Sequence, residues 1–177
     1  MSLKKKIVIF IDGSNFYHGL TKNFGKVKID FSAFAKFLSK DNKLIQIYYY
    51  NVPLNQKDNP EKYRMQQKFF SYLNKIQNLE IKLGRLEKRP KGGLVEKGVD
   101  VRIAVDLVTH AYSNIFDTAI LVSGDADFVP AIKAVQDFGK EVTNICFPKT
   151  KSFHLNQTCN KTITLSKTNI EQILWKK

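Results

Sequence analysis

The sequence predicts an α/β domain built on a mainly parallel sheet. Short, largely apolar runs rich in β-branched residues occur at 7–11, 44–50, 119–122 and 141–147, and the first is continuous. Such runs are typical of strands buried on both faces. Apolar residues recur at helical spacing in the segments between them. Strands that alternate with helices in this way indicate parallel strands joined by right-handed crossovers, a Rossmann-like arrangement.

The remaining elements follow in chain order. An alternating strand is expected at 79–83, nearer an edge of the sheet, so the sheet should have about five or six strands. Helices are expected at 31–38, 60–77, 99–112 and 128–138, with a short terminal helix at 170–175. Pro60 and Pro130 fall in first turns, where proline is tolerated.

The 177 residues fit one domain, 1–177, without repeats or linkers. Two polar stretches interrupt the pattern, a loop at 51–60 and a segment at 85–97. The second is predicted to be a basic loop or hairpin inserted in the domain, because its basic residues surround Gly92-Gly93. Its candidate nucleic-acid contacts are Arg85, Lys88, Arg89, Lys91 and Lys97.

The charge balance points to a polyanionic partner. Twenty-nine Lys and Arg against sixteen Asp and Glu give +13, with a pI near 9.7, which favours nucleic acid or an acidic membrane surface; a role in solubility alone is the alternative. No run approaches the ~18 apolar residues of a membrane span. The two cysteines are too far apart for a CxxC site. A cytoplasmic location is predicted; the oligomeric state stays open, a homodimer included.

Four aspartates follow predicted strands or open a predicted helix. Ligands of open parallel sheets bind outside the carboxyl ends of the strands, and Asp12, Asp125 and Asp127 stand just past two of them. Asp100 opens the helix at 99–112, and a crossover helix begins at the same edge. Asp106 is six positions further, about 240° around the helix, so it is a secondary candidate.

Converging carboxylates of this kind repel one another unless a cation lies among them. Hard oxygen ligands suit Mg²⁺ or Mn²⁺, and the matching chemistry is metal-assisted phosphoryl transfer. Asn15 and Ser123 are expected to orient water or a phosphate, and Lys97 to place a positive charge nearby.

Each candidate also has a structural interpretation. Asp12 with Asn15 could cap the first helix, and Asp127 the helix at 128–138. Asp100 could serve only to interact with a helix dipole, and Asp106 is more typical of a structural residue. Three histidines lack metal-ligand spacing and are interpreted as structural or surface residues, namely His18, His110 and His154.

Three motifs in order resemble the signatures of the NYN domain. They are Ile-Asp-Gly-Ser-Asn-Phe at 11–16, Lys-Gly-Val-Asp-Val at 97–101 and Leu-Val-Ser-Gly-Asp-Ala-Asp-Phe-Val-Pro at 121–130. More narrowly, the chain resembles the LabA-like (DUF88) branch, over about 12–140.

The resemblance implies a PIN-like three-layer α/β/α sandwich and a Mg²⁺-dependent ribonuclease site. The family's acidic positions fall on Asp12, Asp100, Asp125 and Asp127, with Asp106 of less clear role. The preference for RNA over DNA follows from the resemblance alone.

Three functions compete at this stage. The first is hydrolysis of RNA phosphodiesters with Mg²⁺ or Mn²⁺. The second is a non-catalytic RNA-binding or scaffold protein, which would be indifferent to EDTA. The third is a small-substrate phosphohydrolase, although Ser14 stands where haloacid-dehalogenase chemistry would need a second aspartate. The tyrosines at 48–50 either offer a stacking surface for bases or pack in the sheet.

Overall fold

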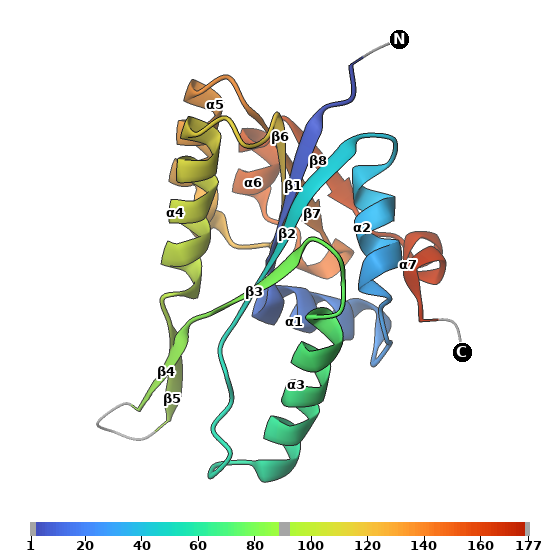
Figure 1. Cartoon of the computed structure of the whole chain (residues 1–177), viewed down its shortest axis with the longest axis vertical. Coiled ribbons are helices and arrows are strands. Elements are labelled where there is room, and N and C mark those ends of the chain that lie inside the picture. Colours follow the sequence, from blue (N-terminus) through green and yellow to red (C-terminus); the bar gives the residue numbers. More distant parts are fainter. Residues whose placement is uncertain (1–2, 89–92, 176–177) are drawn as a thin grey trace.

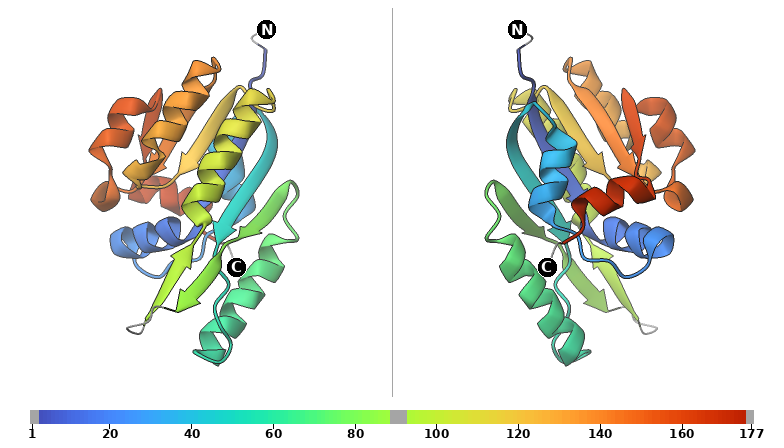
Figure 2. Two further views of the ribbon diagram at one scale, coloured as in Figure 1. Left: turned by 90° about the vertical axis from the view of Figure 1, so that its left-hand side faces the viewer. Right: turned by 90° about the vertical axis from the view of Figure 1, so that its right-hand side faces the viewer.

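A central parallel sheet between two layers of helices forms the fold (Figures 1 and 2). The structure, a computed structural model, describes residues 3–88 and 93–175. The sheet has six strands in the order β3-β2-β1-β6-β7-β8, and all neighbouring strands are parallel, which confirms the predicted fold class. The strands are β1 (Lys6–Asp12), β2 (Lys43–Asn51), β3 (Leu79–Leu83), β6 (Thr118–Val122), β7 (Glu141–Cys146) and β8 (Lys161–Thr164).

Alternating side chains of β1 divide the core between the two faces of the sheet. Ile7, Ile9 and Ile11 point to one face, and Val8 and Phe10 to the other. The first face packs against α1 (Gly13–Phe24), α2 (Phe31–Ser39), α3 (Pro60–Leu73) and α7 (Lys167–Ile173). The second packs against α4 (Val99–Tyr112), α5 (Val129–Asp137) and α6 (Phe153–Thr158). Both faces are therefore buried, as the continuous apolar runs require.

The strand order reverses between β1 and β6. From β1 the chain builds outward through β2 to β3, whereas from β6 it builds outward in the opposite direction through β7 to β8. In open parallel sheets the crevice at such a reversal, outside the carboxyl ends of the strands, is where ligands bind. The segments that leave β1 and β6 therefore border the expected ligand-binding crevice.

A two-stranded antiparallel hairpin stands apart from the main sheet, between β3 and α4 (Figure 1). It consists of β4 (Arg85–Lys88) and β5 (Leu94–Lys97), with Arg85 opposite Lys97. Of the two predicted forms of this segment, loop or hairpin, the structure has the hairpin. The candidate residues Arg89 and Lys91 lie outside the described residues, as does the side chain of Lys88.

The structure departs from the predicted elements in three places. Helix α3 ends at Leu73 rather than 77, because the chain turns tightly after it and Asn78 has a φ of 59°. Helix α7 begins at Lys167, where Ser166 and Asn169 form a capping box. The short helix α6 and strand β8 were not among the predicted elements.

The tyrosines at 48–50 pack in the sheet, so they do not form an exposed stacking surface. All three are buried. The Tyr48 hydroxyl lies 3.0 Å from Nε2 of His110, and the Tyr50 hydroxyl donates to Asp106. In the part of the chain that the structure describes, no helix is long and apolar enough to cross a membrane.

Candidate active site

Asp12 ends β1 and caps α1. Its side chain is only 5% exposed. One carboxylate oxygen accepts a hydrogen bond from the backbone N–H of Asn15 at 3.0 Å, and the other accepts one from Oγ of Ser123 at 3.2 Å. Gly13 makes the tight turn possible, since a Cβ there would lie 2.5 Å from the carbonyl oxygen of Tyr50. The capping interpretation of Asp12 is therefore confirmed, but the cap uses only one of its two oxygens.

The segment after β6 is a hydrogen-bonded turn that leads into the 3₁₀ helix η1 (Ala126–Phe128). Ser123 is buried, and its Oγ accepts from the backbone N–H of Asp125 at 3.2 Å. The carboxylate of Asp125 accepts from the N–H of Asp127 at 2.9 Å and so caps η1. Asp127 caps no helix, since α5 begins after Phe128 without a side-chain cap. The structural role predicted for Asp127 thus belongs to Asp125.

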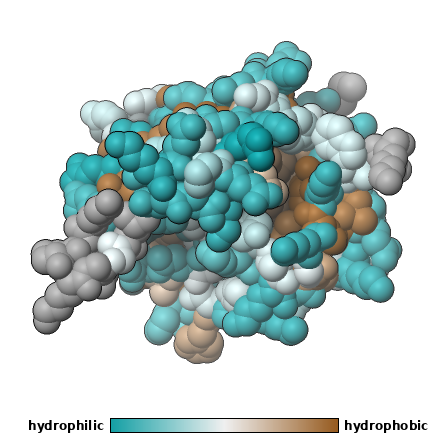
Figure 3. Space-filling model, turned by 90° about the horizontal axis from the view of Figure 1, so that it is seen from below, coloured by the Kyte–Doolittle hydropathy of each residue, from teal (hydrophilic) through white to brown (hydrophobic). Residues whose placement is uncertain are grey.

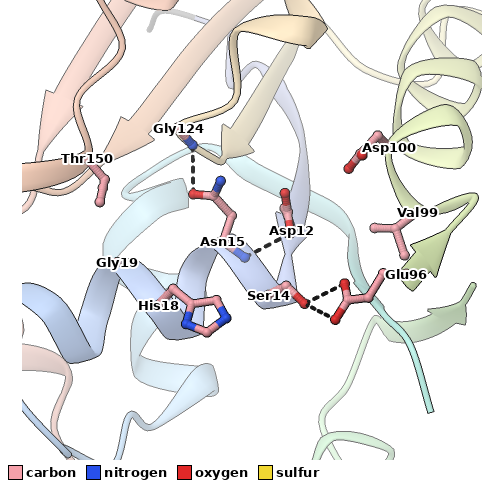
Figure 4. A pocket seen from close by; sticks show the side chains of 10 residues that line it. All are labelled: Asp12, Ser14, Asn15, His18, Gly19, Glu96, Val99, Asp100, Gly124 and Thr150. Atoms are coloured by element: carbon pink, nitrogen blue, oxygen red, sulfur yellow. Dashed lines mark hydrogen bonds between the residues drawn. The ribbon is translucent and has the colours of Figure 1, made fainter. Parts of the chain in front are cut away.

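The side chain of Asn15 joins the two turns across the crevice. Its Oδ1 accepts a hydrogen bond from the backbone N–H of Gly124 at 2.9 Å (Figure 4). Asn144 of β7 supports the same turn by donating to the carbonyl oxygen of Ser123 at 2.8 Å. Asn15 and Ser123 therefore bond to protein groups and hold the carboxylate of Asp12 and its turn in place.

Asp100 reaches the site from the other side of the crevice, in the first turn of α4. The helix starts after Gly98, whose φ of 81° is a backbone conformation that favours glycine. No side chain caps this helix start. Asp100 consequently keeps an exposed carboxylate at the helix N-terminus, next to the turns that follow β1 and β6.

A cavity of about 310 Å³ lies between these segments. Figure 4 shows its walls: α1 and the end of β1 on one side, β5 and the start of α4 on the other, and η2 (Pro148–Thr150) beyond Gly124. The lining residues are Asp12, Ser14, Asn15, His18, Gly19, Glu96, Val99, Asp100, Gly124 and Thr150. Three predicted site residues line the cavity, namely Asp12, Asn15 and Asp100, whereas Ser123, Asp125 and Asp127 are not among its lining residues.

The carboxylates affect one another's ionisation. Burial raises the pKa of Asp12 to about 6, and repulsion from Asp100 and Asp125 adds to the rise, against the hydrogen bonds from Asn15 and Ser123. Desolvation likewise raises the pKa of Asp100, with further contributions from Asp125, Asp127 and Glu96. Repulsion from neighbouring carboxylates thus disfavours the charged state of both Asp12 and Asp100.

The donor chemistry fits a hard divalent cation that retains water. In residues 3–88 and 93–175, no ion pair joins the four aspartates to a basic side chain. Within the same ranges, no three Asp, Glu, His or Cys side chains converge closely enough to hold a metal by themselves. Mg²⁺ needs only one or two protein carboxylates when waters and substrate phosphate complete its shell. A cation here would also relieve the repulsion that raises the pKa of Asp12.

Asp106 is engaged elsewhere. Its carboxylate accepts a hydrogen bond from the Tyr50 hydroxyl at 2.7 Å and pairs with Nζ of Lys82 at 2.8 Å. It is not among the residues that line the cavity. This placement agrees with the structural interpretation of Asp106 and gives no support to a secondary role in metal binding.

Two cavity residues were missed by sequence reasoning. Glu96, which was overlooked within a segment characterised by its basic residues, accepts from Oγ of Ser14 at 2.9 and 3.1 Å and so joins β5 to α1. His18, interpreted above as structural or surface, lines the cavity from α1. The signal for His18 was its spacing, three residues after Asn15 and four after Ser14 on one helix face.

The described basic candidates lie outside the cavity wall. Lys97 is exposed on β5, and Arg85 opposite it forms an exposed ion pair with Glu87 at 2.7 Å. Hydrophilic residues cover most of the molecule when it is viewed from below, the side on which the hairpin lies (Figure 3). A polyanion approaching this side would meet a largely polar surface.

Comparisons with known proteins agree with the architecture. A family model described as the NYN domain matches residues 6–166. The fold is similar to the crystal structure of a protein of unknown function from Vibrio parahaemolyticus, with a TM-score of 0.78, 23% sequence identity and 99% of each chain covered. No curated protein matches the chain. The structural match supports the fold, and the family match covers both strands whose ends form the cavity.

Proposed function

The chain belongs to the NYN domain family of PIN-like nucleases, and on that premise we propose that it is a metal-dependent ribonuclease that hydrolyses RNA phosphodiester bonds. The observation that carries the proposal is Asp12, a buried carboxylate whose pKa is raised to about 6 at a cavity shared with Asp100. A protein gains nothing in stability from such an arrangement. Perturbed carboxylates in a cleft are instead typical of functional sites.

In the proposed site, Asp12, Asp100, Asp125 and Asp127 hold Mg²⁺ or Mn²⁺ directly or through water. When bound, the metal supplies charge neutralisation on the phosphate and a more acidic water. Ser123 and the backbone of Asn15 fix the carboxylate of Asp12 by hydrogen bonds. The link from Gly124 to Asn15 keeps the two turns in register, so the carboxylates stay in place when substrate binds.

RNA is the substrate class that the family membership favours, and the net charge of +13 agrees with a polymeric anion. The hairpin lies beside the cavity, because Glu96 of β5 forms part of the wall. In the proposal, Lys97 and the other basic residues of the 85–97 segment contact the RNA backbone. The carboxylates then act on a phosphodiester in the cavity.

The test is cleavage of single-stranded RNA oligomers by the purified chain with Mg²⁺ or Mn²⁺, with and without EDTA. The wild type should cleave the oligomers, EDTA should stop it, and Asp125→Asn should reduce the rate at least about 10²-fold while RNA binding persists. Asp117→Asn is the matched control, because Asp117 lies at the opposite end of the sheet, bonded to the backbone N–H of Lys6.

Two outcomes would replace the proposal. RNA binding without cleavage under any metal condition would establish the non-catalytic alternative. Turnover of mononucleotides but not of oligomers would establish a small-substrate phosphohydrolase. Full activity of Asp125→Asn would remove the carboxylates from the mechanism.

A further inference from the structure

We propose that His18 is a catalytic residue of this site, the proton donor to the oxygen that leaves when the phosphodiester bond breaks. The proposal rests on the nuclease function proposed above and assigns a role that the acidic motifs do not provide. His18 belongs to none of the three motifs. It is singled out because the fold brings it to the same cavity as Asp12 and Asp100.

The position of His18 follows from helix geometry. Asp12 caps α1, and Ser14, Asn15 and His18 then fall on the face of the helix that lines the cavity. Figure 4 shows the imidazole projecting from α1 into the space that Asp100 and Glu96 face from the opposite wall. Gly19, the next residue, lets α1 pack closely on the core, because a Cβ there would lie 2.3 Å from the ring of Phe147.

Its chemistry is distinct from that of the other cavity residues. In the part of the chain that the structure describes, the wall holds three carboxylates, one imidazole and no lysine or arginine. Imidazole is the side chain that most often gives or takes a proton near neutral pH. Among the described residues the ring forms no hydrogen bond with a protein group, and the Tyr17 ring lies beside it, at 5.6 Å between centroids. It is also solvent-exposed, so water can return the proton after each turnover.

The proposed step balances as follows. A water oxygen forms a bond to phosphorus while the bond from phosphorus to the leaving ribose oxygen breaks. The imidazolium of His18 gives its proton to that oxygen, which departs as a hydroxyl group. The attacking water loses a proton to solvent, and the neutral imidazole takes one from solvent. No oxidant, reductant or further reactant is needed.

The experiment compares His18→Ala and His18→Gln on two kinds of RNA oligomer, with Mn²⁺ because it accepts both oxygen and sulfur ligands. One kind is unmodified, and the other carries a single bridging sulfur, at either the 3′ or the 5′ position, in place of the leaving oxygen. A thiolate leaves without a proton, so loss of the donor should not matter there. We expect both variants to lose about 10²-fold or more in kcat on unmodified RNA. On the oligomer in which sulfur replaces the leaving oxygen, both should approach the wild-type rate.

The controls separate this proposal from its premise. His154→Ala removes a second exposed histidine, on α6 outside the cavity, and should cleave both substrates like the wild type. Normal cleavage of unmodified RNA by either His18 variant would overturn the proton-donor role and leave the nuclease intact, as would an equal loss on both kinds of substrate. A wild type that cleaves neither substrate would overturn the nuclease function and the role of His18 together.

Discussion

Two aspartates next to strand β2, Asp106 and Asp12, differ in whether a basic side chain compensates their charge. Asp106 on α4 is only partly exposed. Its carboxylate forms an ion pair with Nζ of Lys82 on β3 at 2.8 Å and accepts a hydrogen bond from the Tyr50 hydroxyl at 2.7 Å. Asp12 lies opposite Tyr50 in the register of β1 and β2 and is more deeply buried. Its carboxylate accepts hydrogen bonds from two uncharged donors, the backbone N–H of Asn15 and the hydroxyl of Ser123. One carboxylate is neutralised within the protein, and the other is not.

The difference separates a structural acid from a functional one. A buried charge normally has a partner, because desolvation otherwise makes the charged form costly. Asp106 follows that rule. Asp12 departs from it, and its neighbours Asp100 and Asp125 increase the cost by raising its pKa further. In our proposal, a bound divalent metal supplies the compensating charge for Asp12.

The largest expected effect comes from exchanging each aspartate for asparagine. Asp12→Asn should reduce RNA cleavage at least about 10²-fold, and it should also abolish the rise in Tm that we expect Mn²⁺ to cause in the wild type. Asp106→Asn should keep the cleavage rate within a few-fold. It should instead lower the free energy of unfolding by about 2 kcal/mol, because Lys82 loses its charged partner. Steady-state cleavage and thermal unfolding with and without Mn²⁺ measure both effects.

The two variants are each other's control, since both change one carboxylate to an amide of the same shape. Asparagine at position 12 can still accept the cap from Asn15 and donate to Ser123, so the fold should persist. Equal losses of activity in the two variants would mean that Asp106 also acts in the site and that the comparison is mistaken.

The second prediction concerns stability against pH without divalent metal. The pKa of Asp12 is about 6 in the folded chain against an ordinary 3.8, so the folded state binds this proton more tightly than the unfolded state. The contribution of Asp12 to the free energy of unfolding should therefore be largest below about pH 4, fall as pH rises through about 6, and level off above it. A difference of this size corresponds to about 3 kcal/mol.

Chemical denaturation in EDTA from pH 4 to 8 measures this dependence. Asp12→Asn should lack most of the fall and be more stable than the wild type at pH 7, while Asp106→Asn should retain it. Parallel curves for the wild type and Asp12→Asn would show that the carboxylate of Asp12 is compensated within the protein.

The fold was readable from the sequence because its strands are buried on both faces. The apolar runs at 7–11 and 119–122 carry no polar side chain to obscure them, and both became strands of the sheet centre. Strand β8, Lys-Thr-Ile-Thr, is short, mostly polar and at the sheet edge, so its pattern is no stronger than that of a loop. Helix α6 has six residues and a single buried one, Leu155, too few for a periodic signal.

The site was readable only where it follows strand ends. Asp12 is the last residue of β1 and Asp125 follows β6 by three residues, so the topology of a parallel sheet predicted their place. Glu96 and His18 reach the cavity through a hairpin and the second turn of a helix. Helical spacing places His18 on the same face as Ser14 and Asn15, but whether that face and β5 line the cavity depends on how α1 and β5 pack, which no local pattern encodes. Asp125 rather than Asp127 acts as a helix cap because a 3₁₀ turn precedes α5, and no local pattern indicated that turn.

The smallest expected effect concerns the positive charges around the acidic cavity, which the proposal assigns to RNA binding. Lys97→Gln removes one exposed charge beside Glu96 on β5 and should weaken RNA binding about equally for all sequences. The slope of log K against log salt should fall by about 0.7, the value for one phosphate contact on single-stranded RNA. Lys36→Gln is the matched control, an exposed lysine in the last turn of α2, which leads into the amino end of β2. RNA affinity is measured by filter binding at several salt concentrations, with Asp12→Asn in every variant so that the RNA is not cleaved.

An unchanged slope for Lys97→Gln, or the same change for Lys36→Gln, would mean that RNA is held by the overall charge of the chain rather than by the hairpin.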